Sequence, residues 1–167
     1  HPVVLADARL QDIRKRLQPD GLVVQWFHTY EMTDDTLRLL LRTFTASFEY
    51  VTLWSPVTTD LLLIGSKVPF SLNLKESLAR FENAKVKEDL RRLGIESFAT
   101  IISLQVASDE GVRKAAGKGR VNEDLFPVLE YEAPKAFFLG QVSQFLIPYD
   151  ERRYPRDGFP LYFTQYL

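Results

Sequence analysis

The order of segments between residues 21 and 65 constrains the fold of this chain more than any other stretch. Residues 21–27, Gly-Leu-Val-Val-Gln-Trp-Phe, form an apolar run without clean alternation, which predicts a strand covered on both faces. Thr33-Asp34-Asp35 combines a capping hydroxyl with two acids and predicts the start of a helix. Two further β-rich runs, 50–55 and 61–65, flank a short polar link and most simply form an antiparallel pair. Strand, helix and terminal hairpin in this order predict the closing part of a doubly wound α/β sheet, without the glycine-rich turn that opens such sheets.

The segments on either side of this unit show mainly helical periodicity. A helix is predicted within residues 4–17, before the turn at Gln18-Pro-Asp-Gly21. From residue 71 onward, short helices are predicted around residues 74–81, 86–93, 97–106, 109–116 and 135–146, with an extended stretch over 119–134. We therefore divide the chain into a sheet portion over 1–68, a helical extension that packs on it over 69–147, and a Pro- and aromatic-rich tail over 148–167.

Composition excludes several classes of function. The 167 residues carry a formal net charge of −1 with acids and bases interspersed, which argues against a general nucleic-acid binder. Cysteine is absent and only two histidines are present, so neither a thiol nucleophile nor a transition-metal site is expected. No apolar run is long enough to span a membrane, and we expect a cytoplasmic protein, although a parent tethered through other segments is compatible. The first residues, His1-Pro2, lack an initiator Met and predict a processed or truncated chain.

Two separated segments resemble one protein family. The first runs from Leu17-Gln-Pro-Asp-Gly-Leu-Val-Val-Gln-Trp26 through the helix and hairpin to Asp60-Leu-Leu-Leu-Ile-Gly65. The second is Val121-Asn-Glu-Asp-Leu-Phe-Pro-Val-Leu-Glu-Tyr-Glu-Ala-Pro134. Together they resemble the C-terminal half of a spermidine synthase-like (polyamine aminopropyltransferase-like) protein, over most of residues 5–140. The resemblance implies a Rossmann-like sheet of the methyltransferase type, decarboxylated S-adenosylmethionine as aminopropyl donor in the parent, and a polyamine as acceptor.

The candidate substrate-binding residues are Gln25, His28 and Tyr30, with Glu31 beside them. The resemblance gives Gln25 the position of an amide that lines the acceptor pocket, but Trp26-Phe27 stands where the synthases have Gly-Glu. The link 55–60 also lacks the pocket tyrosine of that family. A histidine in a loop after a strand can act as an acid or base near neutral pH. The alternatives are that Gln25 is a structural amide bonded to backbone and that His28 is a cap or a surface group.

The remaining polar motifs favour structural roles. Asp34 and Asp35 suit the dipole of a helix start, while Asp109-Glu110 and Glu123-Asp124 are sequence neighbours that do not face one another on a helix. Gly117-Lys-Gly-Arg120 lacks the first glycine and the hydroxyl residue of a phosphate loop, so it predicts a turn.

Two hypotheses of different class follow. In the first, the chain is the acceptor-side part of an aminopropyl- or methyl-transferase that is inactive alone and binds no donor cofactor by itself. In the second, it is a non-catalytic pseudo-enzyme module that serves docking or regulation. Under either hypothesis the strand at 21–27 needs a neighbour, so we expect a homo-oligomer, or association with the missing N-terminal half. The homodimer would bury Val23, Val24 and Trp26.

Overall fold

The computed structural model describes residues 7–30, 32–57, 59–122, 144–150 and 152 of the chain. Its first half contains α1 (Asp7–Arg16), β1 (Leu22–His28), α2 (Asp34–Ser47), β2 (Tyr50–Val57) and β3 (Asp60–Ser66). Its second half contains α3 (Leu74–Phe81), α4 (Ala84–Arg92), α5 (Phe98–Ser103), β4 (Gln105–Ala107), α6 (Asp109–Ala116) and the 3-10 turn η1 (Ile147–Tyr149). The fold class is α/β, as predicted.

The described strands form one four-stranded sheet in the order β1-β3-β2-β4, and every neighbouring pair is antiparallel. Because β1 and β2 both run antiparallel to β3, they are parallel to each other, and α2 connects them. The hairpin β2–β3 confirms the antiparallel pair expected from the two β-rich runs. The seven residues of β1 pair with β3 without a register shift, from Leu22 opposite Ser66 to His28 opposite Asp60.

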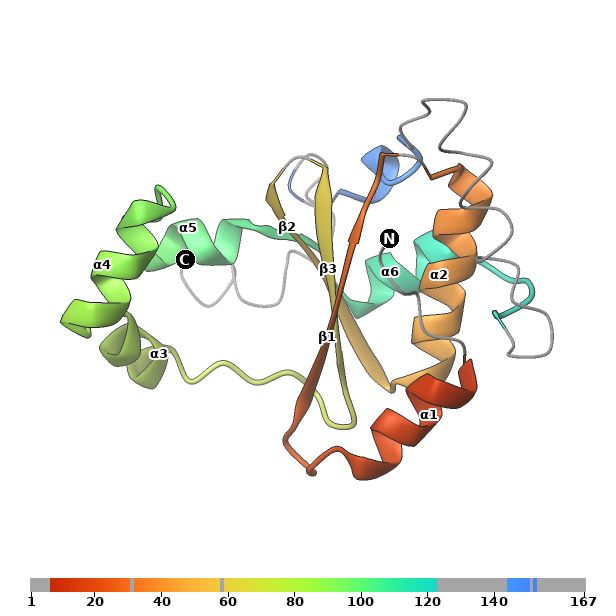
Figure 1. The fold of residues 1–167 in the computed structure, drawn as a ribbon, viewed down its shortest axis with the longest axis horizontal. Coiled ribbons are helices and arrows are strands. Elements are labelled where there is room, and N and C mark those ends of the chain that lie inside the picture. The colour runs from red at the N-terminus through yellow and green to blue at the C-terminus, as the bar shows by residue number, and fades with distance from the viewer. Residues whose placement is uncertain (1–6, 31, 58, 123–143, 151, 153–167) are drawn as a thin grey trace.

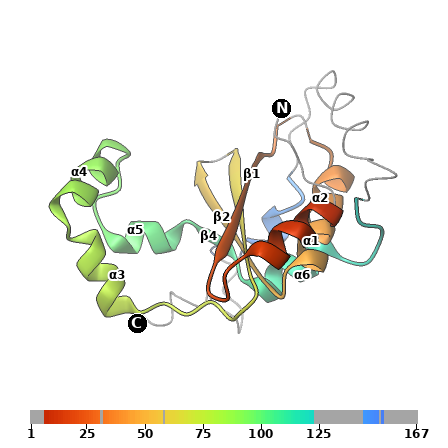
Figure 2. The same cartoon turned by 60° about the horizontal axis from the view of Figure 1, so that its bottom comes forward.

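One face of the sheet is covered by α1, α2 and α6 (Figures 1 and 2). Thr33 begins α2 as expected, since its hydroxyl accepts a hydrogen bond of 3.1 Å from the backbone N–H of Thr36. The stripe predicted on this helix is buried, and Phe44 and Phe48 lie against the sheet with ring centroids 4.9 Å apart. Most of the hydrophobic core therefore lies in the layer between the sheet and these three helices.

The opposite face of the sheet is more open, which corrects the expectation that β1 is covered on both sides. Side chains at successive positions of a strand point to opposite faces. Phe27 points toward the helices and is fully buried, whereas Leu22, Val24 and Trp26 point the other way and are 56%, 55% and 43% exposed. Within the described part of the chain, β1 is also an edge strand, because only β3 pairs with it.

Helices α3, α4 and α5 form an arm that extends away from the sheet, on the left of Figure 1. The apolar faces predicted for α3 and α4 are present, and Gly94 ends α4 with a positive φ of 75°. The helix predicted over 97–106 is wrong in its second half. It ends at Ser103, and Gln105–Ala107 forms β4, because the backbone there pairs with β2 and the N–H of Ser55 donates to the carbonyl of Leu104 over 2.8 Å.

The helix over 109–116 is confirmed as α6, and Gly117 follows it with a φ of 62°. It packs on α2, so the region predicted as a helical extension contributes both α6 and the edge strand β4 to the body of the fold. The predicted helix over 135–146 and the extended stretch beyond Asn122 fall largely outside the described residues. The tail beyond Arg152 also lies outside them.

Candidate functional site

Aromatic side chains gather where β1 ends. Trp26 and His28 are two positions apart and therefore lie on the same face of the strand, with ring centroids 5.8 Å apart in an edge-on arrangement. The ring of Tyr30 stacks on His28 with centroids 3.9 Å apart and an angle of 10° between the planes. Trp26 and Tyr30 remain 43% and 39% exposed, whereas His28 is 8% exposed. The strand end thus presents two accessible aromatic rings with a buried imidazole between them, and we call this group the aromatic cluster.

The hydrogen bond of His28 determines its neutral tautomer. Nδ1 lies 2.7 Å from the backbone carbonyl oxygen of Tyr30, and a carbonyl oxygen can only accept. Nδ1 therefore carries the proton in this contact, and Nε2 holds the lone pair of the neutral ring. An imidazole fixed in this way can accept a proton at Nε2, which is the property required of a general base.

A carboxylate lies next to the cluster. Asp60, the first residue of β3, is directly opposite His28 in the sheet register, and directly opposed residues share a face. The adjacent loops are held together because the backbone N–H of Thr29 donates to the carbonyl of Thr59 over 2.8 Å. Among the described residues, no cation or hydrogen-bond donor engages the Asp60 side chain. The end of the β1–β3 pair therefore combines aromatic faces with a carboxylate that is available to a ligand.

The structure separates the three residues predicted from the sequence. His28 and Tyr30 come together, but Gln25 lies on the other face of β1, opposite the core residue Leu63. The side-chain amide of Gln25 donates to the backbone carbonyl of Trp26 over 2.8 Å, which is the structural role left open as its alternative. Glu31 lies outside the described residues.

Two members of the site were not predicted. Trp26 continues the two-residue spacing of His28 and Tyr30 along an extended chain, so the spacing was the signal that could have found it. Asp60 had no comparable signal, because its place beside His28 depends on the register between two strands that are separated by α2 and β2.

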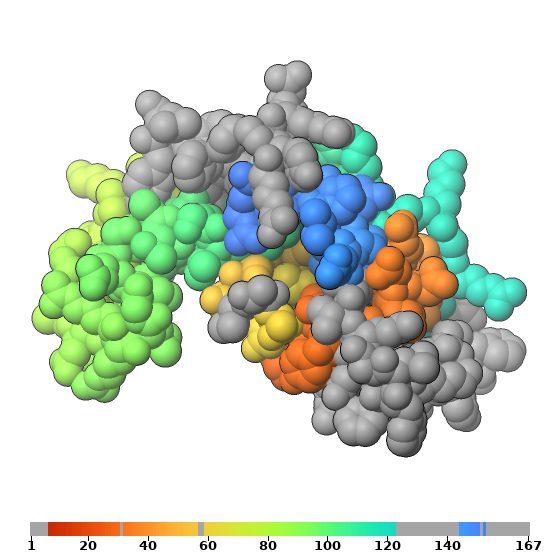
Figure 3. Space-filling model, turned by 90° about the horizontal axis from the view of Figure 1, so that it is seen from above, coloured from red at the N-terminus to blue at the C-terminus, as the bar shows by residue number. Residues whose placement is uncertain are grey.

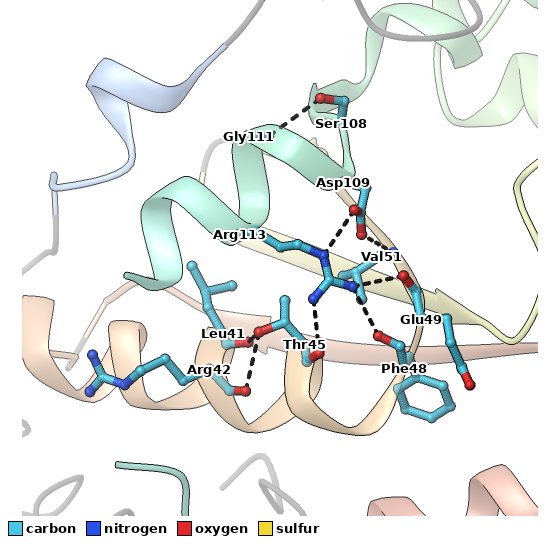
Figure 4. Close-up of polar contacts among 10 residues, drawn as sticks. All are labelled: Leu41, Arg42, Thr45, Phe48, Glu49, Val51, Ser108, Asp109, Gly111 and Arg113. Carbon is cyan, nitrogen blue, oxygen red and sulfur yellow. Dashed lines mark hydrogen bonds and ion pairs between the residues drawn. The ribbon is translucent and has the colours of Figure 1, made fainter. Parts of the chain in front are cut away.

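Apart from the aromatic cluster, the described residues form a pocket between α1, the end of α2 and α6. It is an open pocket of about 240 Å³ whose lining includes Arg14, Ser47, Glu49 and Arg113. The charged groups of the pocket are paired with one another. Arg14 forms an ion pair with Glu49, and this hydrogen bond is the main reason that the pKa of the Glu49 carboxyl is below its usual value. The guanidinium of Arg113 donates hydrogen bonds to the Asp109 carboxylate and to backbone carbonyls at the end of α2 (Figure 4). The pocket therefore has a structural explanation and offers no unpaired group for chemistry.

The part of the chain that the structure describes contains neither a metal-ligand cluster nor a membrane-spanning helix. Among the described residues, no three His, Asp or Glu side chains are grouped as a metal ion would require. None of the described helices combines the length and apolarity needed to cross a membrane. Comparison of the chain with protein-family models, with curated proteins and with solved structures found no match.

Proposed function

We propose that this chain is the acceptor-side part of a spermidine synthase-like transferase, in which the end of β1 holds a cationic amine. The observation that carries the proposal is the aromatic cluster beside the carboxylate of Asp60. An ammonium group is attracted to the faces of Trp and Tyr rings and to a carboxylate. A polyamine presents several ammonium groups along one chain, so it can contact the exposed Trp26 and Tyr30 rings and Asp60 at the same time.

The arrangement of the strands also supports this assignment. Two parallel strands, β1 and β2, with the antiparallel β3 between them, are the arrangement expected at the closing end of a Rossmann-like sheet of the methyltransferase type. In such a sheet the unpaired edge of β1 would continue into the strands of the donor-binding half. Ligands of open α/β sheets bind outside the carboxyl ends of the parallel strands, and the aromatic cluster occupies that end of β1.

In this proposal the donor, decarboxylated S-adenosylmethionine, is bound by the other half of the parent protein. The acceptor amine must lose a proton before it attacks the donor. His28 has the geometry for that step, because Nδ1 is committed to the carbonyl of Tyr30 and Nε2 is left as the acceptor. The chain alone would hold the acceptor without transferring to it.

We expect spermidine to bind the 167-residue chain weakly, and Asp60→Asn to reduce the affinity about fivefold, roughly 1 kcal/mol for loss of an ion pair with a partly buried carboxylate. Isothermal titration calorimetry at low ionic strength measures this effect. Glu110→Gln is the matched control, since it removes one carboxylate from the surface of α6, where Glu110 already faces Lys114 at 3.6 Å. Equal losses in the two variants would indicate attraction by net charge alone and would refute a site at Asp60.

We also expect the chain to bind neither S-adenosylmethionine nor its decarboxylated form at micromolar concentration. The physical reason is that the sequence contains no glycine-rich turn between a strand and a helix to receive the donor. Calorimetry with each compound tests this, and a clear micromolar isotherm would show that the donor site has been assigned to the wrong half.

A non-catalytic docking module is the second candidate. It is favoured by the exposed apolar side chains of β1, Leu22 and Val24, which contribute nothing to an amine site. A chain that binds no amine but associates through this face would fit the docking function.

A further inference from the structure

Two apolar surfaces of this chain have no partner among the described residues. The first, which we call the open sheet face, consists of Leu22, Val24 and Trp26 on β1 with Leu62 and Ile64 of β3 beside them. The register places Val24 opposite Ile64 and Trp26 opposite Leu62, so these side chains form one continuous patch. Leu22 and Val24 are 56% and 55% exposed, although they belong to a strand with no charged residue and no proline. Charged side chains, prolines and β-bulges are the usual features that prevent an edge strand from associating with another chain, and β1 has none of them.

The second surface, which we call the arm stripe, consists of Leu78 on α3, Val86 on α4 and Leu93 at the end of α4. These side chains are 37%, 42% and 75% exposed. They belong to the apolar sides of two amphipathic helices, and an amphipathic helix normally buries this side against another layer.

The arm does not cover the open sheet face of its own chain. It has a small core of its own, in which Phe81 is buried against Phe98 at 6.1 Å between ring centroids. Its main contact with the sheet is made by α5 against β4, at the edge far from β1. Figure 3 shows a hollow between the green arm and the yellow and orange strands of the body. Helices α3, α4 and α5 thus lie away from the open sheet face, on which the described residues place no helix.

We propose that the arm stripe of a second copy packs on the open sheet face, and that the contact is reciprocal around a twofold axis. Each surface supplies what the other lacks, because the sheet face needs a helical cover and the helices need a flat apolar layer. The exposed parts of the six most accessible side chains amount to roughly 500 Å² per copy, so a reciprocal contact that covers all of them buries at most about 1,000 Å² of apolar surface, near the lower limit of a specific interface.

Oligomeric state tests the proposal without any amine, so failure of the dimer and failure of the amine site are distinguishable, although both proposals use the exposed Trp26 ring and an amine would therefore compete with the dimer. Sedimentation velocity from low to high micromolar concentration is the measurement, with Val24→Lys for the sheet face and Leu93→Glu for the arm. Both side chains are more than half exposed, so the variants should fold, which circular dichroism verifies. Lys85→Glu is the control, because it places a carboxylate on the polar side of α4 and changes the net charge by more than Leu93→Glu does.

We expect a dimer for the unmodified chain and for Lys85→Glu, and a dissociation constant raised about tenfold or more in each of the two interface variants. Mixing Val24→Lys with Leu93→Glu should restore association, because one of the two contacts is then unmodified and the other joins opposite charges. A monomer at every concentration would overturn the proposal. Loss of the dimer in Val24→Lys with no effect of Leu93→Glu would also overturn it, and would instead indicate pairing through β1 itself.

Discussion

Gly65→Ala is expected to be among the most destabilising single substitutions of a small residue in this chain. Gly65 lies on β3 between Val23 and Val51, on the face covered by helices. A Cβ atom there would approach Phe48 Cγ to 2.7 Å and Phe44 Cε1 to 2.8 Å, closer than real Cβ contacts. Both rings are buried, so relief requires movement of α2 away from the sheet, and we expect a loss of about 2–3 kcal/mol in the free energy of unfolding. Urea denaturation followed by circular dichroism measures this loss.

A double-mutant cycle identifies the cause. Phe48→Leu alone removes part of a buried ring and should destabilise by about 1–2 kcal/mol, whereas in the Gly65→Ala background it makes room for the new methyl group. We therefore expect the double variant to be more stable than the sum of the two single losses predicts. Strict additivity would mean that the clash is relieved elsewhere, and that the contact between β3 and the Phe44–Phe48 pair is looser than the structure describes.

The elements that the sequence predicted correctly are those with local signals. In α2, the capping hydroxyl of Thr33, the acids that follow it and the apolar stripe ending at Phe48 all lie within one segment. In α6, Asp109 and Gly117 mark the two ends in the same way. Local capping and periodicity were sufficient there, because neighbouring residues already agree with the tertiary fold.

The errors arise where distant residues decide the structure. The apolar run over 97–106 predicts one helix, yet Gln105–Ala107 is a strand, because β2 offers free backbone groups at that edge of the sheet. Dependence on distant residues also explains why the sequence predicted only part of the candidate site. Tyr30 and His28 were predicted from neighbouring positions, but Asp60 joins them only through the register of β3 on β1. Gln25 was assigned to the pocket by resemblance. The alternation of β1 places it on the face opposite to His28, and its part in a pocket stays a prediction.

Helices α2 and α6 are also joined by two arginines, one on each helix, whose side chains donate hydrogen bonds to backbone carbonyls at the end of the other helix. Helix α2 has no basic residue in its last turn, so its final carbonyls need donors from elsewhere. Arg113 of α6 donates to the carbonyl of Thr45 in that last turn over 3.1 Å, and to the carbonyls of Phe48 and Glu49 just beyond it over 3.1 Å and 2.7 Å (Figure 4). Arg42 of α2 returns the contact by donating to the carbonyl of Ala116 at the end of α6 over 3.2 Å. Each helix is therefore capped by the other.

Arg113→Ala should consequently lower the free energy of unfolding by about 2 kcal/mol, since charge-assisted hydrogen bonds are strong but this side chain is partly exposed and water can replace some of them. Arg113→Lys should recover only part of the loss, because a single ammonium cannot reach several carbonyls in the geometry of a guanidinium fork. The matched control is Lys114→Ala on the next position of α6, where the pair with Glu110 is exposed and its removal should cost less than about 0.5 kcal/mol. Chemical denaturation of the three variants measures these losses: if Arg113→Ala were as mild as Lys114→Ala, the hydrogen bonds of Arg113 would contribute little to the packing of α6 on α2. A loss confined to the Arg113 variants would show that the hydrogen bonds of Arg113 to the end of α2 help to hold α6 against the layer that covers the sheet.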